Sequence, residues 1–238
     1  MVADEGIVVD YGEVFYQRAI DQEGVDYNFY GDWQVSYAKM VIAITNIIKA
    51  ASDEQDSLCL DIGCACGVTL RAFKETKAFG RYLGVDISEY LINMGMGTHG
   101  FTKDEMKIMD ITKEPLPCDD DSVTLINCTH MLEHIPKDKL QFVLDEMYRV
   151  LKPEVGFGFV IVPAIKPGNP KSEVQREQTH FIIETMNWWR ARFAKKFKVD
   201  NEVRKRFRIS KHGPLNDGST FYEHYNKGWT IYGLRKEK

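Results

Sequence analysis

Short apolar runs alternate with longer amphipathic segments through the middle of the chain. Each run is too short for a typical helix and ends at a polar residue or a proline, a pattern that favours buried strands. The predicted strands are residues 58–60, 82–85, 106–109, 123–126 and 157–162. Helices are expected between them at residues 68–74, 88–96 and 140–151, the last with its apolar residues on one stripe.

This alternation predicts a single α/β fold with a Rossmann-like, doubly wound sheet. Parallel strands joined by crossover helices bury both faces of such a sheet. Near the end of the chain, residues 197–208 and 228–235 are expected to add two hairpin-like strands. The full prediction is a seven-stranded sheet that is mostly parallel and has an antiparallel last strand.

The two ends of the chain differ from its middle. Apolar residues recur at helical spacing over residues 33–51, so residues 1–54 are expected to form an N-terminal helical cap. Residues 55–238 are expected to form the main domain, in which residues 164–228 are insertions on the substrate side. Within these insertions, a proline- and glycine-rich loop precedes a predicted helix at residues 184–196.

Charge and cysteine content narrow the environment of the protein. A net charge of −4 over 238 residues gives no reason for general attraction to nucleic acids or membranes. Five cysteines, an odd number lying mostly in apolar runs, favour a reducing compartment over a disulfide framework. Residues 1–5 lack the basic start of a signal peptide, and the apolar residues 40–48 are too few to span a bilayer. We therefore expect a cytoplasmic protein with no membrane partner.

Polar residues stand at the carboxyl ends of four predicted strands, namely Asp61, Asp86, Asp110 and Asn127. In an open α/β sheet, ligands bind beyond the carboxyl ends of the strands, near the point where the strand order reverses. These four side chains are therefore expected along one edge of the sheet, which is the predicted binding site.

The loop after the first strand, residues 61–67, reads Asp-Ile-Gly-Cys-Ala-Cys-Gly. Its glycines allow a tight turn and close approach of the backbone to a ligand. Asp86 follows 19 residues after Gly67, where a carboxylate can accept both hydroxyls of a ribose. A dinucleotide site would need another glycine beyond Gly67, and Asp61 is a poor neighbour for a pyrophosphate. The loop thus favours the cationic S-adenosylmethionine (SAM), with a dinucleotide-dependent oxidoreductase as the alternative.

This loop resembles motif I of the class I SAM-dependent methyltransferases, in which an acidic residue precedes alternating glycines and Ala65 here replaces the middle glycine. The resemblance extends from about residue 55 to residue 163 and implies a SAM-binding methyltransferase that releases S-adenosylhomocysteine. It places the methionine end of SAM on the glycine loop, the ribose on Asp86, the adenine between two strand ends and the sulfonium beside the fourth strand. The implied cofactor-binding residues are Asp61, Gly63, Cys64, Gly67, Asp86, Ile87, Asp110, Ile111, Asn127 and Cys128.

Residues 130–134, His-Met-Leu-Glu-His, follow the fourth strand and resemble the Leu-Glu-His element of ubiquinone-biosynthesis-like O-methyltransferases. In some of those relatives, two glutamates and a histidine at this place hold a divalent cation. His130 replaces the first glutamate here, so no metal is predicted, although a metal at His130, Glu133 and His134 stays open. We take His134, His180 and His130 as the candidate catalytic residues, because a base for a hydroxyl acceptor needs a pKa near neutrality. A structural hydrogen bond from His134 to the backbone is the competing interpretation.

The acceptor is predicted to be a small molecule that is methylated at oxygen. Ten of the residues from 190 to 211 are basic, opposed by Asp200 and Glu202. We interpret this run as a solvated face, while an anionic acceptor or a nucleic-acid contact stays open. The alternatives are methylation of a nucleic acid or protein, and a SAM-binding module without catalysis. Oligomeric state is not indicated by the sequence.

Aromatic residues in two predicted helices have competing interpretations. Trp188, Trp189 and Phe193 fall at helical spacing and are expected in the core rather than against the acceptor. Tyr37, in the N-terminal segment, fits either a cover over the cofactor or ordinary packing.

Overall fold

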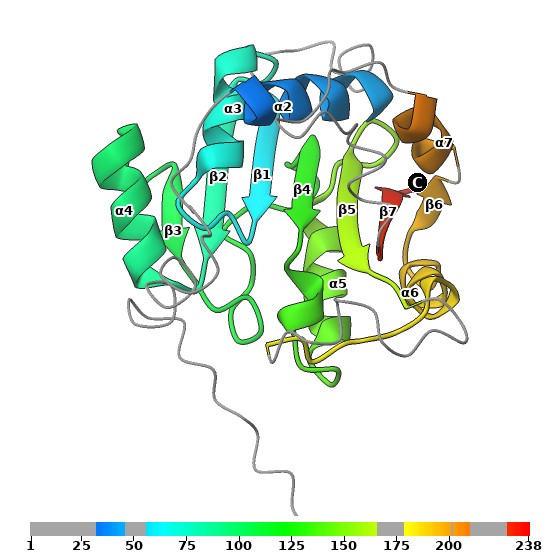
Figure 1. Cartoon of the computed structure of the whole chain (residues 1–238). Helices are drawn as coiled ribbons and strands as arrows, with labels where there is room; N and C mark the ends of the chain where they lie inside the picture. Colours follow the sequence, from blue (N-terminus) through cyan, green and yellow to red (C-terminus); the bar gives the residue numbers. More distant parts are fainter. Residues whose placement is uncertain (1–31, 46–55, 166–178, 201, 210–227) are drawn as a thin grey trace, which may run out of the picture.

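The structure, a computed structural model, describes residues 32–45, 56–165, 179–200, 202–209 and 228–238. Its centre is a seven-stranded sheet in the order β3-β2-β1-β4-β5-β7-β6 (Figure 1). The strands are β1 Leu58–Ile62, β2 Arg81–Asp86, β3 Met106–Ile108, β4 Leu125–Thr129, β5 Phe157–Pro163, β6 Lys198–Asp200 and β7 Trp229–Arg235. Strand β7 runs antiparallel to both of its neighbours, whereas all other pairs are parallel. The predicted seven-stranded, mostly parallel sheet is confirmed.

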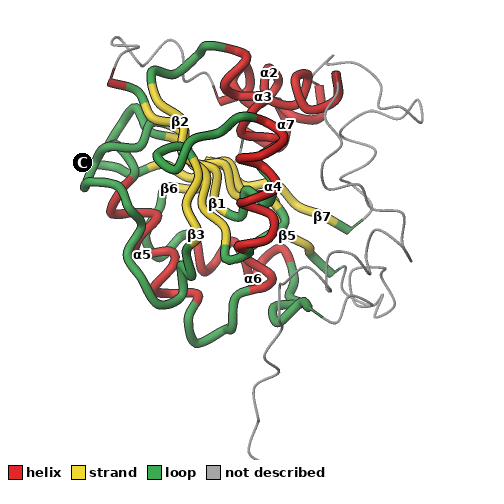
Figure 2. The backbone as a smooth tube through the Cα atoms, turned by 90° about the vertical axis from the view of Figure 1, so that its left-hand side faces the viewer, coloured by secondary structure: helices red, strands yellow, loops and turns green. Residues whose placement is uncertain are grey.

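Helices cover both faces of this sheet. Their bounds are α2 Asp32–Thr45, α3 Val68–Thr76, α4 Glu89–His99, α5 Leu140–Val150, α6 Met186–Phe193 and α7 Val203–Ile209, with a short 3₁₀ helix η3 at Leu132–His134. Figure 2 shows α2, α3 and α7 together on one side of the sheet and α5 on the other. No described helix has the length and apolarity that crossing a membrane would require.

Two apolar clusters separate these layers. On one face, Tyr37 and Met40 of α2 pack with Phe73 of α3, Phe159 of β5 and Phe207 of α7. On the other face, the predicted apolar stripe of α5 packs with Trp189 and Phe193 of α6, which are both fully buried. The interpretation of these two aromatic residues as core is confirmed. Burial of such side chains stabilises the fold by roughly 1.5–3 kcal/mol each, less the entropy of ordering them.

Two of the predicted strands differ most from those observed, and β1 also runs on to Ile62, so Asp61 lies inside that strand and not at its end. The fourth strand was placed at residues 123–126, but β4 covers Leu125–Thr129, because pairing with β1 and β5 continues through Asn127 and Cys128. Asn127 is therefore inside a strand and not at its end. Val123 makes only an isolated bridge to Leu151.

The strand expected at residues 197–208 is mostly a helix. Only Lys198–Asp200 are extended, and α7 follows at once. The Asp200 carboxylate accepts a hydrogen bond from the backbone N–H of Glu202 at 2.9 Å, a turn that redirects the chain into the helix. Val203 and Phe207, four residues apart, are both buried, which is the spacing of one helix face.

Candidate active site

A cavity of about 470 Å³ opens where the parallel strands end. In Figure 1 the arrowheads of β1, β2 and β4 point to this edge of the sheet. The cavity wall comes from the loops that follow β1, β2, β3 and β4, and from two later segments of the chain. The predicted site residues that line it are Gly63, Asp86, Ile87, Asp110, Ile111, His130, His134 and His180.

The glycine loop forms the wall nearest β1 and turns through left-handed backbone conformations. Gly63 has a φ of 74°, and a Cβ there would lie 2.5 Å from the side chain of Met131. Gly67 has a φ of 81°, and a Cβ there would lie 2.7 Å from the Phe101 ring. Ala65 also has a positive φ, 49°, so the alanine in this motif occupies a conformation that favours glycine. The loop is therefore under local backbone strain at Ala65.

Asp86 ends β2 and links the glycine loop to the next helix. One of its carboxylate oxygens accepts the backbone N–H of Ala65 and the other that of Ser88, each at 2.9 Å. Burial raises the pKa of Asp86, and these two hydrogen bonds act against that increase. Each oxygen keeps further acceptor capacity, so the carboxylate is held rigidly where two adjacent hydroxyls can bind.

Apolar and acidic side chains line the neighbouring wall. Ile87 is 47% exposed although it lies in the cavity wall, and it offers an apolar surface of the kind on which a flat ring packs. Across from it, Asp110 accepts hydrogen bonds from the backbone and side chain of Thr112 and pairs with Lys113. Burial acts to raise the pKa of Asp110, but the hydrogen bonds from Lys113 and Thr112 outweigh it and hold the pKa below its usual value.

Asp61 lies behind the cavity wall. Its side chain is 3% exposed and accepts a hydrogen bond from the Asn127 side-chain amide at 2.7 Å. Asn127 in turn accepts one from the Tyr37 hydroxyl at 3.1 Å. Burial raises the pKa of Asp61 to about 7, although the hydrogen bond from Asn127 acts to lower it. Tyr37 of α2 is thus part of a buried hydrogen-bonded chain between that helix and strands β1 and β4, and it does not line the cavity.

Four further cofactor candidates do not line the cavity. Cys64 packs in a buried cluster with Leu70, and Gly67 caps the start of α3. Asn127 and Cys128 lie inside β4, fully buried, and Cys128 is part of the core under α5. The expectation that these two residues follow the fourth strand is therefore corrected, because β4 ends at Thr129, three residues beyond the predicted end.

The opposite half of the cavity holds the three candidate histidines. The rings of His134 and His180 lie 4.8 Å apart between centroids, at 71° to each other. The His134 Nδ1 lies 3.1 Å from the carbonyl oxygen of Thr179. His130 also has a positive φ, 57°, and its ring packs edge-on against Trp229 at 4.0 Å. His134 and His180 are 46 positions apart in the sequence but are neighbours in the structure.

Two further residues belong to this half: Trp229, which was not predicted as a site residue, and Glu133, which was named only as a possible metal ligand. Trp229 contacts both His130 and His180 from the start of β7. Because β7 is antiparallel, its amino end lies beside Pro163 at the edge where the parallel strands finish. Glu133 is fully buried yet lines the cavity, and its backbone carbonyl accepts the N–H groups of Phe181 and Ile182. The sequence feature that could have indicated Trp229 is its position as an aromatic residue at the start of the antiparallel strand.

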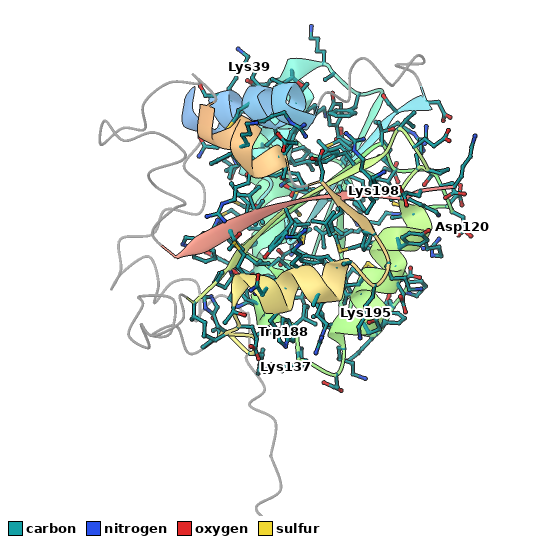
Figure 3. The ribbon with its side chains drawn as sticks, turned by 90° about the vertical axis from the view of Figure 1, so that its right-hand side faces the viewer. Lys39, Asp120, Lys137, Trp188, Lys195 and Lys198 are labelled. Carbon is teal, nitrogen blue, oxygen red and sulfur yellow. The ribbon has the colours of Figure 1, made fainter. Side chains whose placement is uncertain are left out.

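The described residues of the basic run lie outside the cavity wall. Several of them pair with acidic residues elsewhere, such as Lys196 with Asp145 and Lys198 with Glu237. Figure 3 shows Lys195 and Lys198 near α6 and β6 at the surface. The interpretation of this run as a solvated face is supported for the described residues.

Residues 59–154 match the family described as a methyltransferase domain. No curated protein sequence matches the chain at a significant level.

Solved structures with the same fold include three methyltransferases. A phosphoethanolamine N-methyltransferase from Haemonchus contortus, solved with phosphomonomethylethanolamine and S-adenosylhomocysteine, is 15% identical with a TM-score of 0.59, over 97% of this chain and 61% of that one. A putative methyltransferase from Haloferax volcanii, solved with the Trm112 methyltransferase activator, is 18% identical with a TM-score of 0.57, over 87% and 95%. A TehB-like SAM-dependent methyltransferase from Corynebacterium glutamicum is 14% identical with a TM-score of 0.52, over 94% and 96%. Residues 59–154 thus match a methyltransferase domain, and this match together with the shared fold supports the prediction of a SAM-dependent methyltransferase.

Proposed function

We propose that the protein transfers the methyl group of SAM to an oxygen atom of a small molecule. The observation that carries this proposal is a single cavity with two chemically different halves. Asp86 and Ile87 mark one half, and the histidines 130, 134 and 180 mark the other. A volume of about 470 Å³ falls in the range of roughly 300–1,000 Å³ that is typical of small-ligand sites.

SAM fits the half that the glycine loop forms. The two adjacent ribose hydroxyls would donate to the Asp86 carboxylate, whose position two backbone N–H groups fix. The adenine would pack on Ile87, with Asp110 and Ile111 flanking its other side. Asp61, one layer behind the loop, would place negative charge near the sulfonium when it is ionised. These assignments follow the chemistry of SAM, which carries a cation and no phosphate.

The acceptor then lies in the half with the histidines. Methyl transfer forms a bond between the acceptor oxygen and the methyl carbon while the carbon–sulfur bond breaks and its electron pair goes to sulfur. The hydroxyl proton must leave, and imidazole is the side chain whose pKa best suits it to accept that proton near pH 7. Orientation of the oxygen against the methyl group supplies much of the rate, on the order of 7–11 kcal/mol in well-aligned systems. His130 and His180, with Trp229 between them, provide the walls for that orientation.

The cavity wall favours a neutral acceptor over a phosphorylated one. Its described residues include three carboxylates, Asp86, Asp110 and Glu133, and no lysine or arginine. A phosphate group brought into this wall would meet like charge without a permanent cation to balance it. The same reasoning disfavours a nucleic-acid backbone. It supports the hydroxyl-bearing acceptors implied by the resemblance of residues 130–134 to ubiquinone-biosynthesis-like O-methyltransferases.

Incubation with isotope-labelled SAM and a matched panel of acceptors tests the proposal. The panel pairs catechols and phenols with the corresponding aromatic amines and with their phosphorylated forms. We expect label in the neutral hydroxyl compounds and little in the amines or phosphates. Label in amines alone would overturn the choice of oxygen. If S-adenosylhomocysteine bound but every acceptor stayed unlabelled, including RNA and protein extracts, a SAM-binding module without catalysis would be the better account.

A further inference from the structure

The side chains of Glu133, His134 and His180 converge at the acceptor end of the cavity. One ligand atom from each, a carboxylate oxygen and two imidazole nitrogens, can be chosen so that all lie within 4.8 Å of one another. Two imidazoles and one carboxylate form a donor set that first-row transition ions prefer, with zinc among them. This set differs from the one considered from sequence, because His180 takes the place of His130.

The spacing of these atoms suits a metal ion after small side-chain rotations. Zinc binds such nitrogen and oxygen atoms at about 2.0–2.2 Å, so ligand atoms around it lie about 3.3 Å apart in a tetrahedron. The His134 and His180 rings are inclined at 71° and do not stack, an arrangement that allows both to direct a nitrogen at one point. Only the distances among three atoms need to shorten.

The backbone around the cluster holds these side chains in place. The Glu133 carbonyl accepts the N–H groups of Phe181 at 2.8 Å and Ile182 at 3.0 Å, which ties η3 to the segment that carries His180. The ring of His134 places Nδ1 3.1 Å from the Thr179 carbonyl oxygen. A nitrogen beside a carbonyl acts as the donor, so the lone pair of neutral His134 lies on Nε2. Metal-binding histidines commonly show this second hydrogen bond to a carbonyl or carboxylate.

Burial of Glu133 gives a second reason to expect a cation. Its side chain has no exposed surface, and its negative charge contributes, after burial, to the raised pKa of the neighbouring Cys128 thiol. A buried carboxylate is costly in an apolar setting and is often found paired or bound to a metal. An ion held by Glu133 and two imidazoles would have a carboxylate as its negatively charged ligand and would still leave coordination positions toward the cavity, which Glu133 lines.

We propose that Glu133, His134 and His180 bind a divalent first-row transition ion of the zinc type at the acceptor end of the cavity. This inference deepens the proposed function and rests on it. The ion would take the acceptor hydroxyl as a further ligand and favour release of its proton to solvent or to His130. The resulting oxygen anion attacks the methyl carbon of SAM, and the sulfonium leaves as a neutral thioether. His134 and His180 then act as ligands and not as bases.

Metal binding is tested directly on full-length protein stripped with a chelator. Calorimetric titration with Zn²⁺ should give one site per chain, and Co²⁺ should give visible absorption bands from nitrogen and oxygen ligands. We expect His180→Ala and Glu133→Gln to weaken Zn²⁺ binding at least tenfold. The matched control is His130→Asn, which removes a cavity histidine outside the cluster and places at φ 57° a residue that tolerates this conformation. It should keep the wild-type Zn²⁺ affinity.

Titration of the same samples with S-adenosylhomocysteine separates this inference from the proposed function. Bound S-adenosylhomocysteine without a Zn²⁺ site in the wild type would overturn the metal site and leave the methyltransferase proposal standing. Equal Zn²⁺ affinity in wild type and His180→Ala would do the same, as would loss of binding in His130→Asn. If the wild-type protein did not bind S-adenosylhomocysteine, the result would instead count against the proposed function. Retained S-adenosylhomocysteine affinity in each variant shows that it has folded.

Discussion

The backbone N–H of Ala65 donates to the carboxylate of Asp86 at 2.9 Å, which joins the loop after β1 to the end of β2. The two residues are 21 positions apart, and each contributes to the same wall of the cavity. The positive φ of Ala65 turns its N–H toward Asp86, so the strain of the loop and the position of the carboxylate are linked. Four predictions about the site follow from this geometry and from the residues around it.

Replacing Asp86 with alanine should weaken binding of S-adenosylhomocysteine by one to two orders of magnitude. The ribose would lose its charge-assisted hydrogen bonds to the carboxylate, and a net loss of roughly 1.5–3 kcal/mol corresponds to this range. Asp86→Asn should show a smaller loss, because the amide keeps one acceptor oxygen. Calorimetric affinities of the three proteins check this order. Unchanged affinity in Asp86→Ala would remove Asp86 from the cofactor site.

Ala65→Gly should raise the free energy of unfolding by about 0.5–1 kcal/mol. The left-handed conformation costs a non-glycine residue about 1–2 kcal/mol, and the greater freedom of glycine in the unfolded chain offsets part of that relief. Ala65→Val should destabilise the protein, since a β-branched side chain is less tolerant of positive φ. Denaturant unfolding of both variants provides the measurement. A destabilised Ala65→Gly protein would show that φ at residue 65 is not positive in solution.

Asp61 should make the protein less stable as the pH rises. Burial raises its pKa to about 7 in the folded state, from an ordinary value of 3.8. Between these values the folded state holds a proton that the unfolded state has released, so the stability from Asp61 is full below about pH 4 and lost by about pH 7. The total is on the order of a few kcal/mol, at about 1.4 kcal/mol per pKa unit.

The variant Asp61→Asn isolates this effect. The new carbonyl oxygen can still accept the amide hydrogen of Asn127, and no carboxyl remains to titrate. Unfolding experiments at several pH values should show that the free energy of unfolding of the variant rises relative to that of the wild type from pH 4 to pH 7. Parallel stability curves for the two proteins would contradict the burial of an ionisable Asp61.

Trp229→Ala should reduce turnover and raise the acceptor KM while leaving the affinity for S-adenosylhomocysteine within about twofold. The indole contacts the rings of His130 and His180, so its loss loosens the acceptor half alone. Trp229→Phe keeps an aromatic ring at this place and should recover much of the activity. Parallel losses of cofactor affinity and turnover in Trp229→Ala would point to a general role in β7 packing.

The sequence predicted the cavity-lining residues that follow β1 and end β2 because the signals for them are local. A buried strand followed by glycines places Gly63, and a carboxylate at the next strand end places Asp86; both line the cavity. Each position depends on one strand and the turn that follows it. Strand length was harder to predict, since pairing of β4 with β1 and β5 carried Asn127 and Cys128 into the strand.

The acceptor half depends on contacts between distant segments, which the order of residues does not reveal. His180 lies beside His134 where the backbone N–H of Phe181 donates a hydrogen bond to the carbonyl of Glu133. Trp229 reaches His130 because β7 runs antiparallel to β5 and starts at the cavity edge. The strand expected over residues 197–208 is a helix at α7, because Val203 and Phe207, four residues apart, are both buried against the core.

Calorimetric titration of the purified protein with S-adenosylhomocysteine, beside NAD as a control, tests the central claim most directly. The arrangement of Asp86, Ile87 and the glycine loop predicts micromolar or tighter binding of S-adenosylhomocysteine and no binding of NAD. Binding of NAD alone, or of neither compound, would contradict a SAM site in this cavity.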